Sequence, residues 1–266
     1  MKQEIDFLIA CGRNSEEYVQ FLINSVEQTT SSTNFRFVLG INDDCVSEEK
    51  LLKIKSHYPI KVVDCRTKGV YSYGHGQSLD ALVHYVETDY FVICDCDVVF
   101  LTEEWDQLFL NNFLADEKLA IIGAEYDGSK YMNFPNVVMS MLKTQIIKQC
   151  NVSFLPAPPE KRKLTITHEN SKIYGRDVGE VIDLDTGWQL CYNLKSNGYN
   201  GLTLPLRRKS VGDECIFLKE GVRGEEYLLD DKPICSHVGR SFTRSFDNPI
   251  VVSWRQNTEE WFNGKK

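Results

Sequence analysis

Two aspartates, Asp95 and Asp97, interrupt the apolar stretch YFVICDCDVVF over residues 90–100. Residues i and i+2 of a strand point to the same side, and open α/β sheets bind ligands beyond the carboxyl ends of their strands. Two ionised carboxylates this close repel each other unless a cation lies between them. A hard cation such as Mn²⁺ or Mg²⁺ completes its coordination with phosphate oxygens and water, so the pair predicts a phosphorylated ligand. The alternative is a pair of surface turn residues.

The apolar pattern around this pair indicates strands that alternate with helices. Short apolar runs predict strands, and a spacing of i, i+3, i+4 and i+7 predicts amphipathic helices. Alternation of the two favours a mainly parallel, doubly wound sheet. Residues 155–165 hold three prolines and a basic cluster and predict a loop, whereas residues 207–232 are charged, contain glycine and predict a mobile segment. Strands are predicted over 5–10, 35–41, 60–63, 90–95, 119–124 and 137–142, and helices from 15, over 48–57, after a loop at 74–76, up to about 150 and over 188–194.

Length, composition and net charge argue against a nucleic-acid-binding protein, a disulfide-rich secreted protein and a membrane-spanning protein. A chain of 266 residues that is 42% hydrophobic can bury one sizeable core, and a net charge of −8 disfavours nucleic-acid binding. Nine scattered cysteines without a C-x-x-C pair indicate free thiols in a reducing compartment. Neither a membrane span nor a signal peptide is predicted. We therefore expect a cytoplasmic protein. Peripheral contact with a membrane surface and the oligomeric state are both left open.

In the order of its motifs, the chain over residues 4–240 resembles the GT-A fold glycosyltransferases, which carry an Asp-x-Asp motif at the end of a strand. The segments that carry the resemblance are ACGRNSEEYVQFLINSV, GHGQSLDALVHYVETDYFVICDCD, NVVMSMLKTQIIKQCNVSF, DTGWQLCYNLKSNGY and SHVG. The resemblance implies an α/β fold of GT-A type, with a mainly parallel mixed sheet flanked by helices and a less regular second half. It implies one domain over 1–266: residues 1–125 would bind a nucleotide-sugar, 126–240 the acceptor, and 241–266 would form a tail.

The same resemblance implies a metal-dependent glycosyltransferase. Its donor would be a UDP-, GDP- or dTDP-sugar, and its acceptor a hydroxyl group of a glycan, a lipid-linked sugar or a protein, with inversion favoured over retention. Asp97 would be the principal ligand of Mn²⁺ or Mg²⁺. Asp95 would contact ribose, or the metal through water, and His237 in CSHVGRS would complete the metal shell.

Further donor contacts are implied on both sides of the metal motif. One of Asp43 and Asp44 would bind the base or ribose, and Arg240 would lie on the diphosphate, with a solvated basic turn as the alternative for Arg240. Asp80 would lie against the donor, or would serve only the helix dipole. The other implied donor-side residues are Cys11, Arg13, His75, Gly76 and Gln77.

An inverting reaction needs a base that takes the proton of the acceptor hydroxyl. Asp185 in DLDTGWQL is the candidate base. The acidic pair that such enzymes commonly carry before a helix falls at Thr186 and Gly187 here, so Asp183 and Asp177 stay open as alternatives.

Two other functions compete with sugar transfer. A nucleotidyltransferase that makes sugar nucleotides has a similar sheet, but it normally carries a glycine-rich, lysine-containing phosphate loop near its N-terminus, and ACGRNSEEYV has one glycine and no lysine. A non-catalytic nucleotide- or carbohydrate-binding module would bind without turnover. The missing acidic pair at Thr186 and Gly187 keeps that second alternative open.

Overall fold

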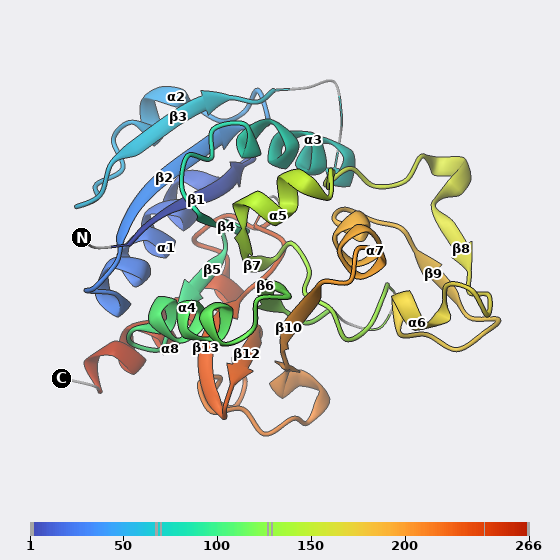
Figure 1. Ribbon diagram of the computed structural model, residues 1–266. Helices are drawn as coiled ribbons and strands as arrows, with labels where there is room; N and C mark the ends of the chain where they lie inside the picture. Colours follow the sequence, from blue (N-terminus) through green and yellow to red (C-terminus); the bar gives the residue numbers. More distant parts are fainter. Residues whose placement is uncertain are drawn as a thin grey trace.

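The computed structural model describes residues 3–66, 69, 71–126, 128, 130–241 and 243–264. At its centre is a seven-stranded sheet in the order β10-β6-β7-β4-β1-β2-β3 (Figure 1). Neighbouring strands are parallel except at β7, which runs antiparallel to both β4 and β6. The predicted mainly parallel mixed sheet is therefore confirmed. Its strands are β1 (Glu4–Cys11), β2 (Asn34–Ile41), β3 (Ile60–Asp64), β4 (Tyr90–Cys94), β6 (Leu119–Ala124), β7 (Met139–Lys143) and β10 (Asn200–Leu204).

A second, antiparallel sheet adjoins the first, in the order β11-β12-β13-β5. Strand β5 follows β4 after a three-residue turn, so the chain passes from one sheet to the other through Asp95, Cys96 and Asp97. A separate hairpin of β8 and β9 forms an arm with the short helix α6 to one side of the sheets (Figure 1). These strands are β5 (Val98–Phe100), β8 (Lys163–Thr165), β9 (Val181–Asp183), β11 (Leu206–Arg207), β12 (Glu225–Leu229) and β13 (Lys232–His237).

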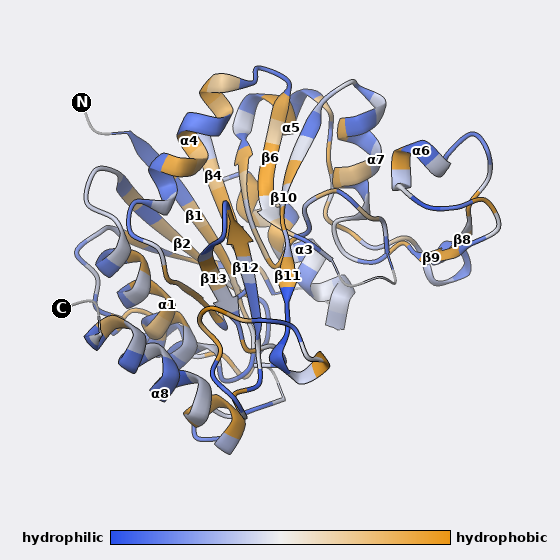
Figure 2. Cartoon of the chain, turned by 90° about the horizontal axis from the view of Figure 1, so that it is seen from below, coloured by the Kyte–Doolittle hydropathy of each residue, from blue (hydrophilic) through white to orange (hydrophobic). Residues whose placement is uncertain are grey.

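Helices cover both faces of the central sheet, because its strands are apolar on both sides. Alternate residues of β1 enter different cores: Phe7 packs with α1, α4, α8 and the second sheet, whereas Leu8 packs with α3, α5 and α7. Figure 2 shows hydrophobic strands between helices whose outer faces are hydrophilic. The helices are α1 (Ser15–Thr29), α2 (Glu48–Leu51), α3 (Tyr71–Val83), α4 (Trp105–Ala115), α5 (Thr144–Gln149), α6 (Ser171–Tyr174), α7 (Trp188–Ser196) and α8 (Pro249–Asn263).

Several local predictions were wrong. Helix α2 ends at Leu51 rather than near residue 57. Gly74 and Gly76 lie inside α3 rather than in a loop before it. These positions suit glycine because neighbouring backbone leaves no room for a Cβ atom. Strand β12 lies within the segment 207–232, which was expected to be mobile, because its three apolar residues are too few to stand out from the surrounding charges.

Helix α8 lies in the segment 241–266, which was expected to be a tail. Its Val251 and Trp254 are fully buried in the core shared with α1 and the second sheet. The division of the chain into donor and acceptor halves stays a prediction.

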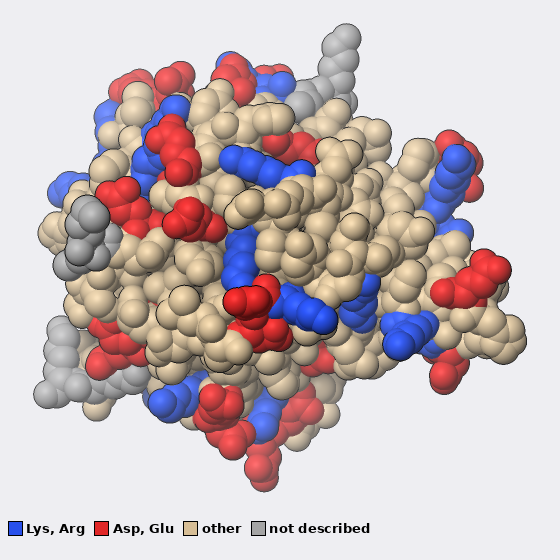
Figure 3. Space-filling model, in the orientation of Figure 1, with Lys and Arg blue, Asp and Glu red and all other residues tan. Residues whose placement is uncertain are grey.

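The surface is mixed in charge. On the face shown in Figure 3, acidic and basic side chains are interspersed and do not gather into one basic patch. In the part of the chain that the structure describes, every helix is too short or too polar to cross a membrane.

Candidate metal centre

The Asp95–Asp97 turn is held from both sheets. The amide N–H of Asp95 donates to the Val138 carbonyl at 2.8 Å, just before β7 of the central sheet. The carbonyl of Asp97 accepts from the Val238 amide at 3.1 Å, just after β13 of the second sheet. The turn therefore lies where the two sheets meet, at the carboxyl end of β4, where ligands of α/β sheets bind.

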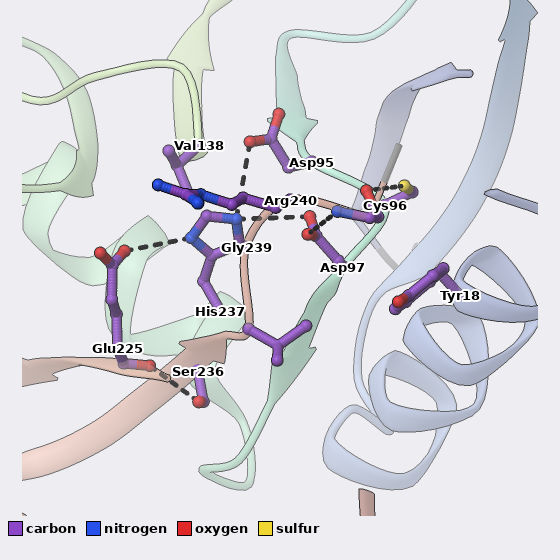
Figure 4. Close-up of polar contacts among 12 residues, drawn as sticks. Tyr18, Asp95, Cys96, Asp97, Val138, Glu225, Ser236, His237, Gly239 and Arg240 are labelled. Atoms are coloured by element: carbon purple, nitrogen blue, oxygen red, sulfur yellow. Dashed lines mark hydrogen bonds and ion pairs between the residues drawn. The ribbon is translucent and has the colours of Figure 1, made fainter. Parts of the chain in front are cut away.

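Both carboxylates point toward one imidazole (Figure 4). Nε2 of His237 lies 3.3 Å from Oδ1 of Asp97 and 3.8 Å from Oδ2 of Asp95. The Ser241 amide also donates to Asp97 at 3.1 Å. His75, from α3, also approaches Asp95, with 3.5 Å between Nε2 of His75 and Oδ1 of Asp95. The fold thus brings together the two aspartates and two of the predicted histidines.

Burial and pairing act in opposite directions on the charges of this cluster. Burial disfavours ionisation of Asp97, but His237 and the Ser241 amide outweigh it and lower the pKa of Asp97. Burial alone would lower the pKa of His237, yet Asp97 and Glu225 raise it well above its usual value. Burial dominates at Asp95 and raises its pKa, although His75 and His237 oppose that shift. Ionisation of Asp95 and Asp97 is therefore favoured by positive charge close to both carboxylates.

The donor set fits a divalent cation. One ligand atom each from Asp95, Asp97 and His237 can be chosen so that all three lie within 4.8 Å of one another. The separations of 3.3 and 3.8 Å from His237 are below about 4.2 Å, twice an Mg–O bond length. Two carboxylates with one imidazole suit Mn²⁺ better than Mg²⁺, which prefers oxygen ligands alone.

A glutamate that the sequence did not single out lies behind His237. Oε2 of Glu225 is 3.1 Å from Nδ1 of His237. Burial alone would raise the pKa of Glu225, but contacts with His237, Tyr227 and Arg208 outweigh it and lower that pKa to about 2. Glu225 opens β12, and the sequence signal for this strand was only the short apolar run over residues 227–229 shortly before CSHVG. A cavity of about 210 Å³ adjoins this pair. Its lining is Glu125, Tyr126, Asn136, Val138, Leu206, Arg208, Glu225, Tyr227 and His237.

Asp185, the predicted base, is paired with two cations. Nζ of Lys130 lies 3.1 Å from its Oδ2, and Arg162 contacts its Oδ1. Burial opposes ionisation, but Lys130, the Thr186 amide and Arg162 outweigh it and lower the pKa of Asp185. Lys130 is 5% exposed and also acts on the charge of Asp95, so Asp185 lies on the Asp95 side of the site.

The two other candidate bases lie in the arm that α6, β8 and β9 form. Asp183 pairs with Arg162 at 2.6 Å and with Lys163 at 3.2 Å, which ties β9 to β8. Asp177 is exposed in the loop after α6. Of the three candidates, only Asp185 reaches toward the metal cluster, through Lys130.

The other predicted residues of α3 pack against the chain at 153–155. The carboxylate of Asp80 accepts from the Ser153 hydroxyl and the Phe154 amide, each at 2.7 Å. A Cβ atom on Gly76 would lie 2.7 Å from the Phe154 carbonyl oxygen. Gln77 is half-buried beside Gly69. These contacts fix α3 so that His75 can face Asp95.

The predicted donor residues after β1 and β2 lie at the same edge of the sheet. Arg13 is exposed and contacts the Cys45 thiol at 3.3 Å. Asp43 accepts from the Cys45 amide at 2.7 Å and so closes its own turn, whereas Asp44 is exposed and 3.6 Å from Arg66. The Cys11 thiol is fully buried in the core, and burial raises its pKa to about 12, so the fold does not bring that thiol to the edge.

Arg240 lies in the turn that follows β13. Its backbone φ is 65°, in the left-handed region, and its side chain is exposed. Its carbonyl accepts from the amides of Thr243 and Arg244, each at 3.0 Å, which closes the turn over Asp97 and Ser241.

Comparison with solved structures identifies the architecture. The mannosyltransferase PcManGT from Pyrobaculum calidifontis, in complex with GDP-Man and Mn²⁺, matches with a TM-score of 0.50 at 10% identity, over 77% of this chain and 55% of that chain. This chain has the GT-A fold. Residues 1–349 of TarS from S. aureus match with a TM-score of 0.43 at 16% identity, over 65% of this chain and 54% of that chain. No family model and no curated protein matches the sequence. The matches thus span little more than half the length of those solved chains.

Proposed function

We propose that this chain is a metal-dependent glycosyltransferase that moves a sugar from a nucleoside-diphosphate sugar to a hydroxyl acceptor. The observation that carries the proposal is the cluster of Asp95, Asp97 and His237 at the carboxyl end of β4 in a GT-A fold. The PcManGT structure of the same fold holds GDP-Man and Mn²⁺, which supports a donor and a metal of these kinds.

The residues divide the work between metal and donor. Asp97, Asp95 and His237 would hold Mn²⁺, or Mg²⁺ in its place. The bound metal would supply positive charge against the diphosphate of the leaving nucleotide. Asp43 or Asp44 would bind the base or ribose, and Arg13 and Arg240, both exposed at this edge, would meet the phosphates. His75 would keep its place beside Asp95 on the donor side.

We place Asp185 on the acceptor side, as the base of an inverting transfer. Its pairing with Lys130 and Arg162 makes it a weak base, because a lowered pKa reduces the driving force for proton abstraction. Glu125 in the cavity beside His237 is the competing carboxylate. If Asp185 is the base, D185N will lower the rate of transfer to an acceptor by about 10²- to 10⁴-fold, and E125Q will not.

The test is release of nucleoside diphosphate. UDP-, GDP- and dTDP-sugars are incubated with the protein and Mn²⁺, with and without simple sugar acceptors, and the free diphosphate is measured. We expect release from one donor class, lost on removal of Mn²⁺ by a chelator. Release of pyrophosphate from a nucleoside triphosphate and a sugar phosphate would instead favour a nucleotidyltransferase, and binding without any release would favour a binding module.

A further inference from the structure

His237 has different neighbours at its two ring nitrogens. Nε2 faces Asp97 and Asp95, at 3.3 and 3.8 Å. Nδ1 faces the other way, toward Oε2 of Glu225 at 3.1 Å (Figure 4). A neutral imidazole can bind a cation through one nitrogen only while the other carries the proton. The identity of the partner at Nδ1 therefore decides whether Nε2 is free to bind a metal.

Glu225 is itself held in place on three sides. It pairs in register with His237 across β12 and β13. The Tyr227 hydroxyl donates to Oε2 at 2.6 Å, and Nε of Arg208 donates to Oε1 at 2.9 Å. The Ser236 hydroxyl donates to the backbone carbonyl of Glu225 at 2.7 Å. The carboxylate consequently meets Nδ1 in a single orientation.

We propose that Glu225 is the positioning residue of the metal site: it accepts the Nδ1–H of His237 and so turns the lone pair of Nε2 toward Asp95 and Asp97. A carboxylate behind a histidine ligand fixes the ring and strengthens it as a donor. The ligand of the site is a divalent cation, and the inference rests on the proposed function only in requiring that cation. Tyr227 and Arg208 hold the carboxylate of Glu225 in place.

The competing explanation is that Glu225 only joins strands β11, β12 and β13. The next residue in the chain provides a matched control for that explanation. Glu226 is fully buried, and its carboxylate accepts from the amides of Ile216, Phe217 and Leu218 at 2.7, 2.8 and 3.1 Å, away from His237. Substitution of Glu226 disturbs the same strand without touching the imidazole.

The experiment measures the affinity for Mn²⁺ alone, by calorimetry and by the electron paramagnetic resonance of free Mn²⁺, in folded wild-type protein, E225A, E225Q, E226Q and D97N. Thermal unfolding is recorded for each. We expect E225A to bind Mn²⁺ about 10- to 100-fold more weakly than wild type. E225Q keeps an acceptor oxygen without the charge and should fall between the two. E226Q should lose stability and keep the wild-type affinity.

The outcomes separate the role of Glu225 from the metal site itself. Wild type that binds Mn²⁺ no better than D97N removes the metal site and the proposed function with it. If wild type, E225A and E225Q all bind Mn²⁺ with the same affinity, only the role of Glu225 is overturned. Equal weakening in E225Q and E226Q also overturns that role, because affinity then follows the stability of the strand. If E225A does not fold, E225Q against E226Q decides the matter in the same way.

Discussion

Nε2 of His237 lies 3.3 Å from a carboxylate oxygen of Asp97. His237 ends strand β13, whereas Asp97 lies far earlier in the chain, in the turn just before strand β5. Strands β13 and β5 pair antiparallel, with His237 opposite Val98. The site therefore requires the second sheet as much as the central one. Substitutions that loosen β13 should displace His237 even when the substituted residue does not contact it.

Helix α8 provides such a distant support. Trp254 is fully buried, and its Nε1 donates to the Ser236 hydroxyl at 2.9 Å, one residue before His237. We expect W254A to lower the free energy of unfolding by about 3–5 kcal/mol, because it leaves a large cavity. W254F keeps most of the packing and should lose less, with about 1 kcal/mol due to the hydrogen bond. Urea unfolding measures both, and a W254A loss below that of W254F would contradict this role.

The close contact between α3 and the chain at 154 gives a second prediction. An added Cβ on Gly76 would lie 2.7 Å from the backbone oxygen of Phe154, which cannot move aside as a flexible side chain would. Overpacking costs about 1–3 kcal/mol and outweighs the roughly 1 kcal/mol that alanine gains in a helix. G76A should therefore lower the melting temperature, whereas Y73A on the exposed side of α3 should change it less. A G76A protein as stable as wild type would refute the contact.

The ion pairs of Asp185 predict a pH dependence of stability. Burial raises the pKa of Asp185, but Lys130 and the Thr186 amide outweigh it, so the folded pKa lies below the unfolded value of about 4. A lowered folded pKa adds stability that is complete above the unfolded pKa and is lost as the pH falls through the folded pKa. We expect D185N to cost about 1–3 kcal/mol at neutral pH and less below about pH 4.

Unfolding in urea across this pH range tests the Asp185 prediction. The exposed Asp177 is the control, and D177N should stay within about 0.5 kcal/mol of wild type. A penalty for D185N that is the same in acid as at neutral pH would show that the ion pairs are not its source.

The sequence predicted the inner strands β1, β2, β4, β6 and β7 of the central sheet because they are buried on both faces. Such strands are continuous apolar runs, as in Leu119–Ala124, and are easily told from the amphipathic helices between them. The acidic pair was found for the same reason, since Asp95 and Asp97 contrast with the apolar residues on both sides. Strands β10, β12 and β13 and the helices α4 and α8 were missed. The burial of β12, β13 and α8 depends on their packing together in one core rather than on local pattern. Helix α4 was missed although its buried Trp105, Phe109 and Phe113 recur at helical spacing.

Partnerships between side chains were harder to predict than elements. Nothing local to Glu225 announces that strand pairing places it opposite His237. Likewise, Asp185 was chosen for its position before α7, and its pairing with Lys130 and Arg162 depends on how the β8–β9 arm folds back. Asp80 was weighed between a donor contact and the helix dipole, whereas its hydrogen bonds to Ser153 and Phe154 arise from tertiary packing.

The central claim is that Asp97 holds a divalent cation against a nucleoside diphosphate. Its most direct measurement is thermal unfolding of wild type and D97N with UDP, GDP or dTDP, each with and without Mn²⁺ and each compared with its own ligand-free baseline. For wild type we predict stabilisation by one of the diphosphates that requires Mn²⁺, about 2.7 kcal/mol at a hundredfold excess over Kd, and for D97N none that requires Mn²⁺. A wild-type protein that no diphosphate stabilises in a Mn²⁺-dependent way, or a D97N protein that responds as wild type does, would contradict the claim.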